Sequence, residues 1–149
     1  MTGPISANGA CPGCGLRPPA WWRGAVELDR PLRASPACWG LHAEAVGFEL
    51  QHLAALGRFH QLTVDAYGAQ HAGPPTGQRY VAYSVVGLAL AIEHGWSGTQ
   101  VRDLHARMGP VQPSWPLLPP PPESASISIA DVVAAGAWAT SPDGHAHTV

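Results

Sequence analysis

The stretch SPACWGLHAEAVGFELQHLAAL, residues 35–56, carries the strongest helix signal in the chain. Ser35 suits an N-cap, and Pro36 fits the first helical position because its missing N–H would have no partner there. Apolar residues recur at three- and four-residue steps and predict one buried stripe, made of Trp39, Ala43, Val46, Leu50 and Leu53. Gly57 is a natural end for this helix. The segment therefore predicts a long helix with one face against a core.

Two further helices are predicted downstream. One runs from about Phe59 to Ala72, where the stretch Gly73-Pro74-Pro75 ends it. The next starts after Thr76 and stops at Gly95, and its expected buried face holds Val81, Val85, Leu88 and Ile92. Since the connection near Gly57 is short, we expect the first two helices to fold back as an antiparallel hairpin.

A short fourth helix is predicted between Ser97 and Gly109, because Ser97 and Gln100 match a capping box. A last helix is expected near Ser128, with Asp131 in its first turn. No segment alternates convincingly between apolar and polar residues, as a half-buried strand would. The predicted fold class is therefore all-α, a small bundle of about five helices.

The length of 149 residues, 46% of them hydrophobic, fits one compact domain over residues 1–149. Residues 1–10 are expected to form a flexible arm, and residues 140–149 a flexible tail. The Pro-rich segment 110–127 must be extended. We favour a role in wrapping the helices through Trp115, Leu117 and Leu118, and the alternative is a strap that binds a protein partner.

Charge and hydropathy exclude several classes of protein. The formal charge of −2, with eight Arg and no Lys, does not favour nucleic-acid binding. The longest nearly apolar stretch, residues 80–92, is too short to span a bilayer. The start of the chain lacks the features of a secretory signal, so we expect a cytoplasmic protein whose three cysteines are thiols or metal ligands.

The pentapeptide CPGCG, Cys11–Gly15, is the most informative short motif. Two thiolates separated by two residues can bind one tetrahedral ion, and Gly15 lets the backbone turn tightly after the second of them. The redox interpretation of CxxC needs a βαβ context, which is missing here. Cys38 lies in the first turn of the predicted helix, whose N-terminus favours the thiolate form. Alternatively, Cys38 is a small buried apolar residue.

A histidine is the expected fourth ligand, and three are candidates. In an antiparallel hairpin that turns near Gly57, His71 lies opposite about residue 44, at the Cys38 end. His60 then lies about 25 Å along the axis from Cys38. We therefore predict His71 as the ligand, His42 as the reserve, and His60 as a partly buried imidazole held by a hydrogen bond. Three thiolates and one imidazole favour zinc, with iron as the alternative metal.

Four stretches together resemble a known family: CPGCG, SPACW (residues 35–39), HQLTVDAYGAQH (residues 60–71) and the helix end at residues 92–95. They are similar to an uncharacterised bacterial family, domain of unknown function 5946. The resemblance implies that its signature residues are Cys11, Cys14, Cys38, His60, Asp65 and His71, and it implies no activity. The chain departs from the family pattern with Ala72 in place of Pro and Ser84 in place of His.

Three functional hypotheses follow. The first is a structural Cys3His zinc site that joins the Cys-bearing loop to the helices. The second is a metal-dependent enzyme with a pocket on the helix 59–72, lined by His60, Asp65, Tyr67 and Gln70. Asp65 is read more simply as a cap, or as the ion-pair partner of Arg23 or Arg30. The third is a nucleic-acid or protein-binding module that uses the Arg- and Trp-bearing loop 17–33, whose simpler reading is a solvated loop anchored by tryptophans.

Overall fold

The computed structural model describes residues 9–20, 22, 26–111, 114–122, 126–127 and 131. Four α-helices follow one another in this part of the chain: α1 (Pro36–Gln51), α2 (Leu53–Gln70), α3 (Gln78–His94) and α4 (Gly98–Met108). The described residues contain no strand, which confirms the all-α class. The helix predicted near Ser128 lies, apart from Asp131, outside the described residues. So do the tail 140–149 and residues 1–8 of the arm.

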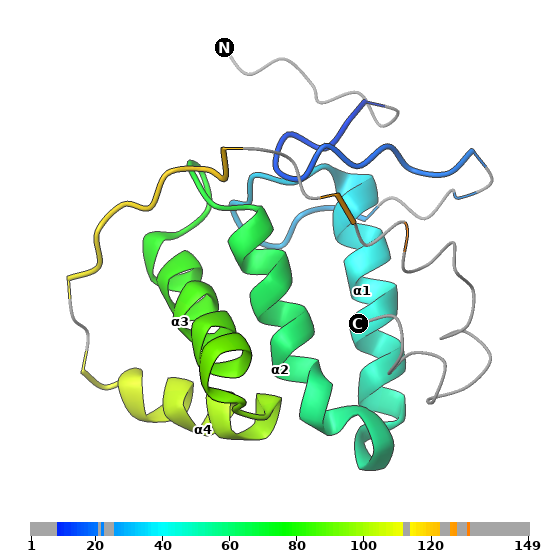
Figure 1. The fold of residues 1–149 in the computed structure, drawn as a ribbon. Coiled ribbons are helices and arrows are strands. Elements are labelled where there is room, and N and C mark those ends of the chain that lie inside the picture. The colour runs from blue at the N-terminus through cyan, green and yellow to red at the C-terminus, as the bar shows by residue number, and fades with distance from the viewer. Residues whose placement is uncertain are drawn as a thin grey trace.

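Helices α1, α2 and α3 run up and down side by side, and α4 crosses below the end of α3 (Figure 1). The Cys-bearing loop covers the opposite end of the bundle, above the start of α1 and the end of α2 (Figure 1). Residues before α1 and after α2 therefore meet at one end of the bundle. None of the helices in the described residues is long and apolar enough to cross a bilayer.

The helix-end signals of the sequence are confirmed where they depend on local chemistry. The Ser35 hydroxyl accepts a hydrogen bond from the backbone N–H of Cys38, and Pro36 occupies the first helical position. Ser97 and Gln100 form the predicted capping box of α4. Gly95 ends α3 in the left-handed conformation, with φ of 68°, which glycine adopts without a steric penalty.

The turn between α1 and α2 lies at His52, and the prediction of a turn near Gly57 is wrong. The His52 ring nitrogen Nδ1 lies 2.9 Å from the carbonyl oxygen of Phe48, and the His52 backbone N–H donates to Glu49. These bonds satisfy carbonyl groups that a helix end leaves without partners. Gly57 lies inside α2. Glycine alone is a weak signal for a helix end. Here the hydrogen bonds of His52 end α1 before Gly57 is reached.

The predicted apolar stripe of α1 is also wrong. Leu50 and Leu53 are about half exposed, at 50% and 53%, and Ala43 is exposed. The face turned to the rest of the protein instead holds Cys38, Leu41, His42, Ala45 and Glu49, all buried. Polar side chains occupy this face because they interact with side chains of α2, as described below.

Helix α3 packs closely on α2 through small residues. A methyl group at Gly68 of α2 would overlap Ser84 and Tyr80, and one at Gly87 of α3 would overlap the carboxylate of Asp65. Of the predicted buried face of α3, Val81 is buried, Leu88 is partly buried, and Val85 and Ile92 are exposed. The close contact with α2 therefore selects a face of α3 that hydrophobic periodicity did not identify.

The Pro-rich segment runs from the end of α4 along the outside of α3 and returns to the Cys-bearing end of the bundle (Figure 1). Trp115 packs edge-on against Tyr83 of α3, with ring centroids 5.9 Å apart. Leu118 is partly buried, whereas Leu117 is exposed. The described part of this segment thus wraps the helices as predicted, with Trp115 as its main anchor.

Candidate metal centre

The CPGCG motif forms a tight turn that brings its two cysteines together. Gly15 has φ of 75°, and its N–H donates to the carbonyl of Cys11 at 2.8 Å. The N–H of Cys11 donates to the carbonyl of Leu16 at 2.7 Å, which closes the loop. Both cysteine side chains are buried. The turn therefore presents two sulfur atoms on its inner side, as the motif predicts.

Gly13, between the two cysteines, is required for a different reason. A methyl group at this position would overlap the carbonyl oxygen of Arg33 and the imidazole of His71. The loop therefore approaches the chain before α1 and the end of α2 as closely as a backbone can. The motif predicts a role for Gly15 but none for Gly13, because the contact of Gly13 depends on two segments distant in the chain.

Four side chains from three parts of the chain converge below this loop: Cys11, Cys14, Cys38 and His71. Their sulfur and nitrogen atoms all lie within 4.8 Å of one another. All four residues are buried, and Cys38 and His71 have no exposed surface. Among the described residues this is the one group of three or more His, Cys, Asp or Glu side chains close enough to share a metal ion.

The distances within the group fit a tetrahedral ion. The sulfurs of Cys14 and Cys38 are 3.7 Å apart, and His71 Nε2 lies 3.4 Å from the sulfurs of both Cys11 and Cys38. A tetrahedral zinc ion about 2.3 Å from sulfur and 2.0–2.1 Å from nitrogen separates neighbouring ligands by roughly 3.5–3.8 Å. A disulfide would need sulfurs only about 2.05 Å apart. The spacing is therefore that of ligands and not that of a disulfide.

The orientation of His71 is fixed from its other side. Its Nδ1 lies 2.7 Å from the carbonyl oxygen of Tyr67, so this nitrogen carries the proton that it donates. When the ring is neutral, as a metal ligand must be, Nε2 has a single lone pair, and it faces two sulfurs at the same distance. One lone pair cannot accept well from two thiols at once, whereas a metal ion between them would use it fully.

A hydrogen-bonded bridge holds the backbone around His71. The hydroxyl of Thr76 donates to the carbonyl of His71 at 2.6 Å and accepts from the N–H of Arg33 at 2.9 Å. The Arg33 guanidinium also donates to the carbonyl of Ala72 at 3.3 Å. These contacts join the segment before α1 to the end of α2, so the ligands on either side keep their relative position.

Tyr67 supports two members of the group at once. Its hydroxyl donates to the sulfur of Cys38 at 3.5 Å, and its carbonyl accepts from His71. The hypothesis of a catalytic pocket on the helix 59–72 included Tyr67, but it did not link this residue to the cysteines. The four-residue spacing between Tyr67 and His71, one helical turn, was the available signal.

The ionisation of the cysteines and His71 is coupled. Hydrogen bonds with Cys14 and Cys38 lower the pKa of the Cys11 thiol, whereas hydrogen bonds with Cys11 and Cys14 raise the pKa of Cys38. Burial lowers the pKa of His71, but hydrogen bonds with Cys11 and Cys14 raise it by more, to about 9. The three sulfurs thus compete to ionise, and a divalent cation among them would stabilise all three as thiolates.

His42, the reserve ligand, does not belong to the group. Its ring stacks on Tyr67 with centroids 3.9 Å apart and on Trp39 with centroids 5.2 Å apart. Burial, together with the charges of His71, His60 and Arg30, lowers the pKa of His42 to about 3. His42 is therefore a neutral ring in an aromatic stack beside the cysteines.

His60 lies at the other end of the α1–α2 hairpin, as predicted for an imidazole held by a hydrogen bond. Its Nδ1 is 2.9 Å from a carboxylate oxygen of Glu49, a residue with no exposed surface. The hydroxyl of Thr63 donates to the other oxygen of the same carboxylate. Glu49 is a buried acid that the sequence analysis missed, because it lies on the face expected to be solvated.

The proposed catalytic set on α2 is not assembled. Asp65 is buried and lines a pocket between α2, α3 and α4, whereas Tyr67 contacts Cys38 and His60 contacts Glu49. The ion pair expected between Asp65 and Arg30 is also wrong, because Arg30 pairs with Asp29 at 3.0 Å. Arg23, the other suggested partner, lies outside the described residues.

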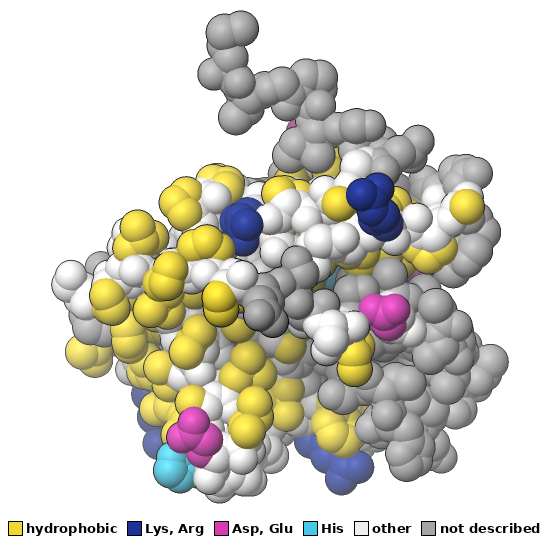
Figure 2. All heavy atoms as spheres, turned by 45° about the horizontal axis from the view of Figure 1, so that its top comes forward, with side chains coloured by type: hydrophobic (Ala, Val, Ile, Leu, Met, Phe, Trp, Pro, Cys, Tyr) yellow, Lys and Arg dark blue, Asp and Glu magenta, His cyan; other side chains and the backbone are white. Residues whose placement is uncertain are grey.

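The loop 17–33 does not present one basic surface in its described part. Trp22 is buried, and its indole N–H donates to Glu44 at 3.0 Å. This residue therefore anchors the loop, as expected if the loop is solvated and held by tryptophans. Arg30 pairs with Asp29, and Arg33 donates to the carbonyl of Ala72. On the face in Figure 2 the arginines form separate spots and not a patch.

Comparison with known proteins identifies the family. The sequence pattern of a family of unknown function, DUF5946, matches residues 9–149, so the chain belongs to this family. No curated protein and no solved structure matches the chain. The family therefore agrees with the resemblance found in the motifs, and it assigns no activity.

Proposed function

We propose that this member of the DUF5946 family binds one zinc ion through Cys11, Cys14, Cys38 and His71, and that the ion is structural. The observation that carries the proposal is the convergence of four buried donor atoms within 4.8 Å, at separations close to the edges of a tetrahedron. Three sulfurs and an imidazole favour zinc over harder cations that prefer oxygen ligands.

A structural role follows from the number and burial of the ligands. Four protein ligands fill the tetrahedral shell of zinc and leave no position for a substrate or an activated water. Cys38 and His71 are fully buried, and Gly13 lies directly against the His71 ring, so a substrate has no path to the ion on that side.

The ion would join three segments that are distant in the chain. Cys11 and Cys14 belong to a loop without regular structure, Cys38 lies in the first turn of α1, and His71 caps the end of α2. Ligand binding that exists only in the folded state adds directly to the free energy of folding. Since zinc needs reduced thiols, we place the protein in the cytoplasm.

The test compares two histidines of α2. We expect purified protein to hold one zinc per chain, His71→Ala to lose it, and the matched control His60→Ala to retain it. A strong chelator should lower the melting temperature of the unaltered protein by about 10 °C or more, because structural zinc contributes several kcal/mol. Equal zinc content in the two variants, or a melting temperature unaffected by chelation, would contradict the proposal.

A further inference from the structure

The described part of the Pro-rich segment, residues 114–122, presents prolines to solvent while it wraps the helices. We call these residues the proline strap. Their sequence, SWPLLPPPP, holds five prolines and no charged side chain. All five prolines are exposed, and Leu117 is 57% exposed. Figure 2 shows hydrophobic side chains, prolines included, gathered on the left side of the molecule, along which the strap runs in Figure 1.

The prolines restrict the strap to the polyproline II conformation. Each proline fixes its own φ at about −65° and keeps the residue before it out of the α region. The four consecutive prolines at 119–122 therefore define a short polyproline II helix. The strap forms no backbone–backbone hydrogen bond with the described residues, as expected for this conformation, whose N–H and C=O groups do not bond to one another. Its carbonyl groups can therefore accept hydrogen bonds from a partner.

The exposure of the strap follows the three-residue period of this helix. Polyproline II completes one turn in about three residues and rises about 3.1 Å per residue, so every third residue lies on the same edge. Trp115 and Leu118, three positions apart, are the partly buried residues of the strap. The next edge holds only exposed prolines, spaced about 9 Å apart: Pro116, Pro119 and Pro122. The strap therefore turns one edge to the helices and an edge of prolines to solvent.

Two contacts hold the strap in place. The ring centroids of Trp115 and Tyr83 are 5.9 Å apart in an edge-on arrangement. Farther along, Pro120 lies against Gly73, where a methyl group would come within 3.3 Å of the proline ring. A segment that is extended and anchored before it binds loses less conformational entropy on binding than a free chain does. The exposed edge is therefore preorganised for a partner.

We propose that the proline strap is the docking site for a partner protein that holds polyproline II in a groove lined with aromatic side chains. Such grooves recognise prolines at the PxxP spacing, which the exposed edge offers twice, from Pro116 to Pro119 and from Pro119 to Pro122. Aromatic rings of the groove pack on the proline rings, and its tyrosine hydroxyls or tryptophan N–H groups donate to the carbonyls of the strap. A strap without charged side chains suits a groove of this kind.

A second copy of this chain is a poorer match for the exposed edge. Wrapping the helices uses the edge with Trp115 and Leu118 and leaves the proline edge unoccupied. In polyproline II, residues 116–122 span about 22 Å and form a strip that is one chain wide. A stable dimer buries about 800 Å² on each partner, far more than such a strip offers. A groove that accommodates a single extended chain therefore fits the strap better.

The experiment measures, by calorimetry, the binding of the full-length protein to two isolated domains that recognise polyproline II, an SH3 domain and a WW domain. A free peptide of residues 114–122 is the comparison. We expect at least one of the domains to bind the folded protein, and to bind it at least as tightly as the peptide, because the strap is already extended and anchored.

Two single substitutions distinguish the edges of the strap. Pro119→Ala lies at the centre of the proline edge, and we expect it to weaken binding about fivefold or more. Pro121→Ala is the matched control, because position 121 lies on the edge of Leu118, which is turned to the helices. It should bind as the unaltered protein does. Both positions are exposed, so the two variants should have the melting temperature of the unaltered protein.

Three results would overturn the proposal. The first is no binding of either domain to the folded protein at about 1 mM. The second is weaker binding of a domain to the folded protein than to the peptide, because the strap would then be covered. The third is a loss of affinity in Pro121→Ala that equals or exceeds the loss in Pro119→Ala, because the two edges would then be equivalent. Zinc content is measured separately on the same samples, so failure of the zinc proposal remains distinct.

Discussion

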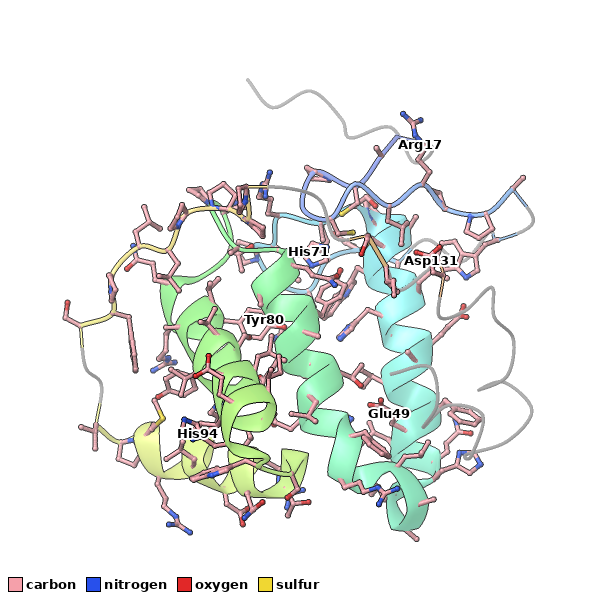
Figure 3. The ribbon with its side chains drawn as sticks, viewed as in Figure 1. Arg17, Glu49, His71, Tyr80, His94 and Asp131 are labelled. Atoms are coloured by element: carbon pink, nitrogen blue, oxygen red, sulfur yellow. The ribbon has the colours of Figure 1, made fainter. Side chains whose placement is uncertain are left out.

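The two ends of the α1–α2 hairpin are both polar and buried, yet only one of them fits a metal ion. Figure 3 shows His71 and Glu49 at these opposite ends. At the first end, His71 meets three sulfurs. At the second, His60 and Thr63 meet the carboxylate of Glu49. Both ends use a histidine of α2 and a buried residue of α1.

The two ends differ in their balance of hydrogen-bond donors and acceptors. Glu49 accepts hydrogen bonds, and His60 and Thr63 can supply them, so the second end satisfies itself. At the first end, three sulfurs and one imidazole lone pair converge, and their ionised forms need a cation from outside. Burial and polarity alone therefore do not distinguish the two ends, whereas the surplus of electron-pair donors at the first end does.

The same helix pairing positions both ends. Three residues of α1, Cys38, His42 and Glu49, each face a residue of the second helix. In order, these are His71, which caps α2, and Tyr67 and His60 within α2. The steps along the two helices match, at four and then seven residues, as expected for antiparallel neighbours. A polar seam thus runs along this interface, with an aromatic stack between its two ends.

Removal of the carboxylate of Glu49 should have the largest effect among these tests. Glu49→Ala leaves a cavity and removes the acceptor of the buried Thr63 and the partly buried His60, and we expect it to lower the free energy of unfolding by about 3 kcal/mol. Zinc content should stay at the unaltered level, because the ligands lie at the other end. Denaturant unfolding and elemental analysis check this, with the exposed Glu93→Ala as the control. A loss of zinc in Glu49→Ala would show that the two ends are not independent.

Asp65 is also a buried acid, but it differs from Glu49 in its hydrogen bonds. Glu49 pairs with His60 and Thr63, whereas Asp65 pairs only with Gln61 among the described residues. Its pKa of about 7 in the folded protein exceeds the unfolded value of 3.8, so folding becomes less favourable as pH rises from about 4 to 7. Asp65→Asn should therefore increase the free energy of unfolding more at pH 8 than at pH 4, and we expect the difference to be on the order of 2 kcal/mol. Urea unfolding at the two pH values measures this. An equal gain in stability at both pH values would show that the pKa of Asp65 is not raised on folding.

Tyr67→Phe should have the smallest effect. It removes the hydroxyl that donates to Cys38 but keeps the carbonyl that orients His71. We expect a loss of about 1 kcal/mol in stability and roughly tenfold weaker zinc binding, measured by competition with a chromophoric chelator. Tyr80→Phe, which loses a hydrogen bond to a backbone carbonyl, is the matched control and should bind zinc normally. Equal zinc affinity in both variants would separate Tyr67 from the metal centre.

Local signals predicted much of the architecture. Ser35 and Ser97 begin helices, Gly95 ends one, and CPGCG turns so that its sulfurs face inward. Each of these depends on side chains within a few residues of the backbone groups they satisfy. The convergence of Cys38 and His71 also followed from the sequence, although the turn assumed near Gly57 was misplaced.

The amino-acid sequence by itself determined where the helices begin and which residue types gather at the cysteine loop, because capping and tight turns act over single hydrogen bonds. Tertiary structure alone decided which face of α1 is buried, that Tyr67 supports Cys38, and that Asp65 lies in a pocket apart from the other acids. Those outcomes depend on the register between helices. Register is set by the packing of many side chains that are distant from one another in the chain, and a local sequence pattern does not contain this information.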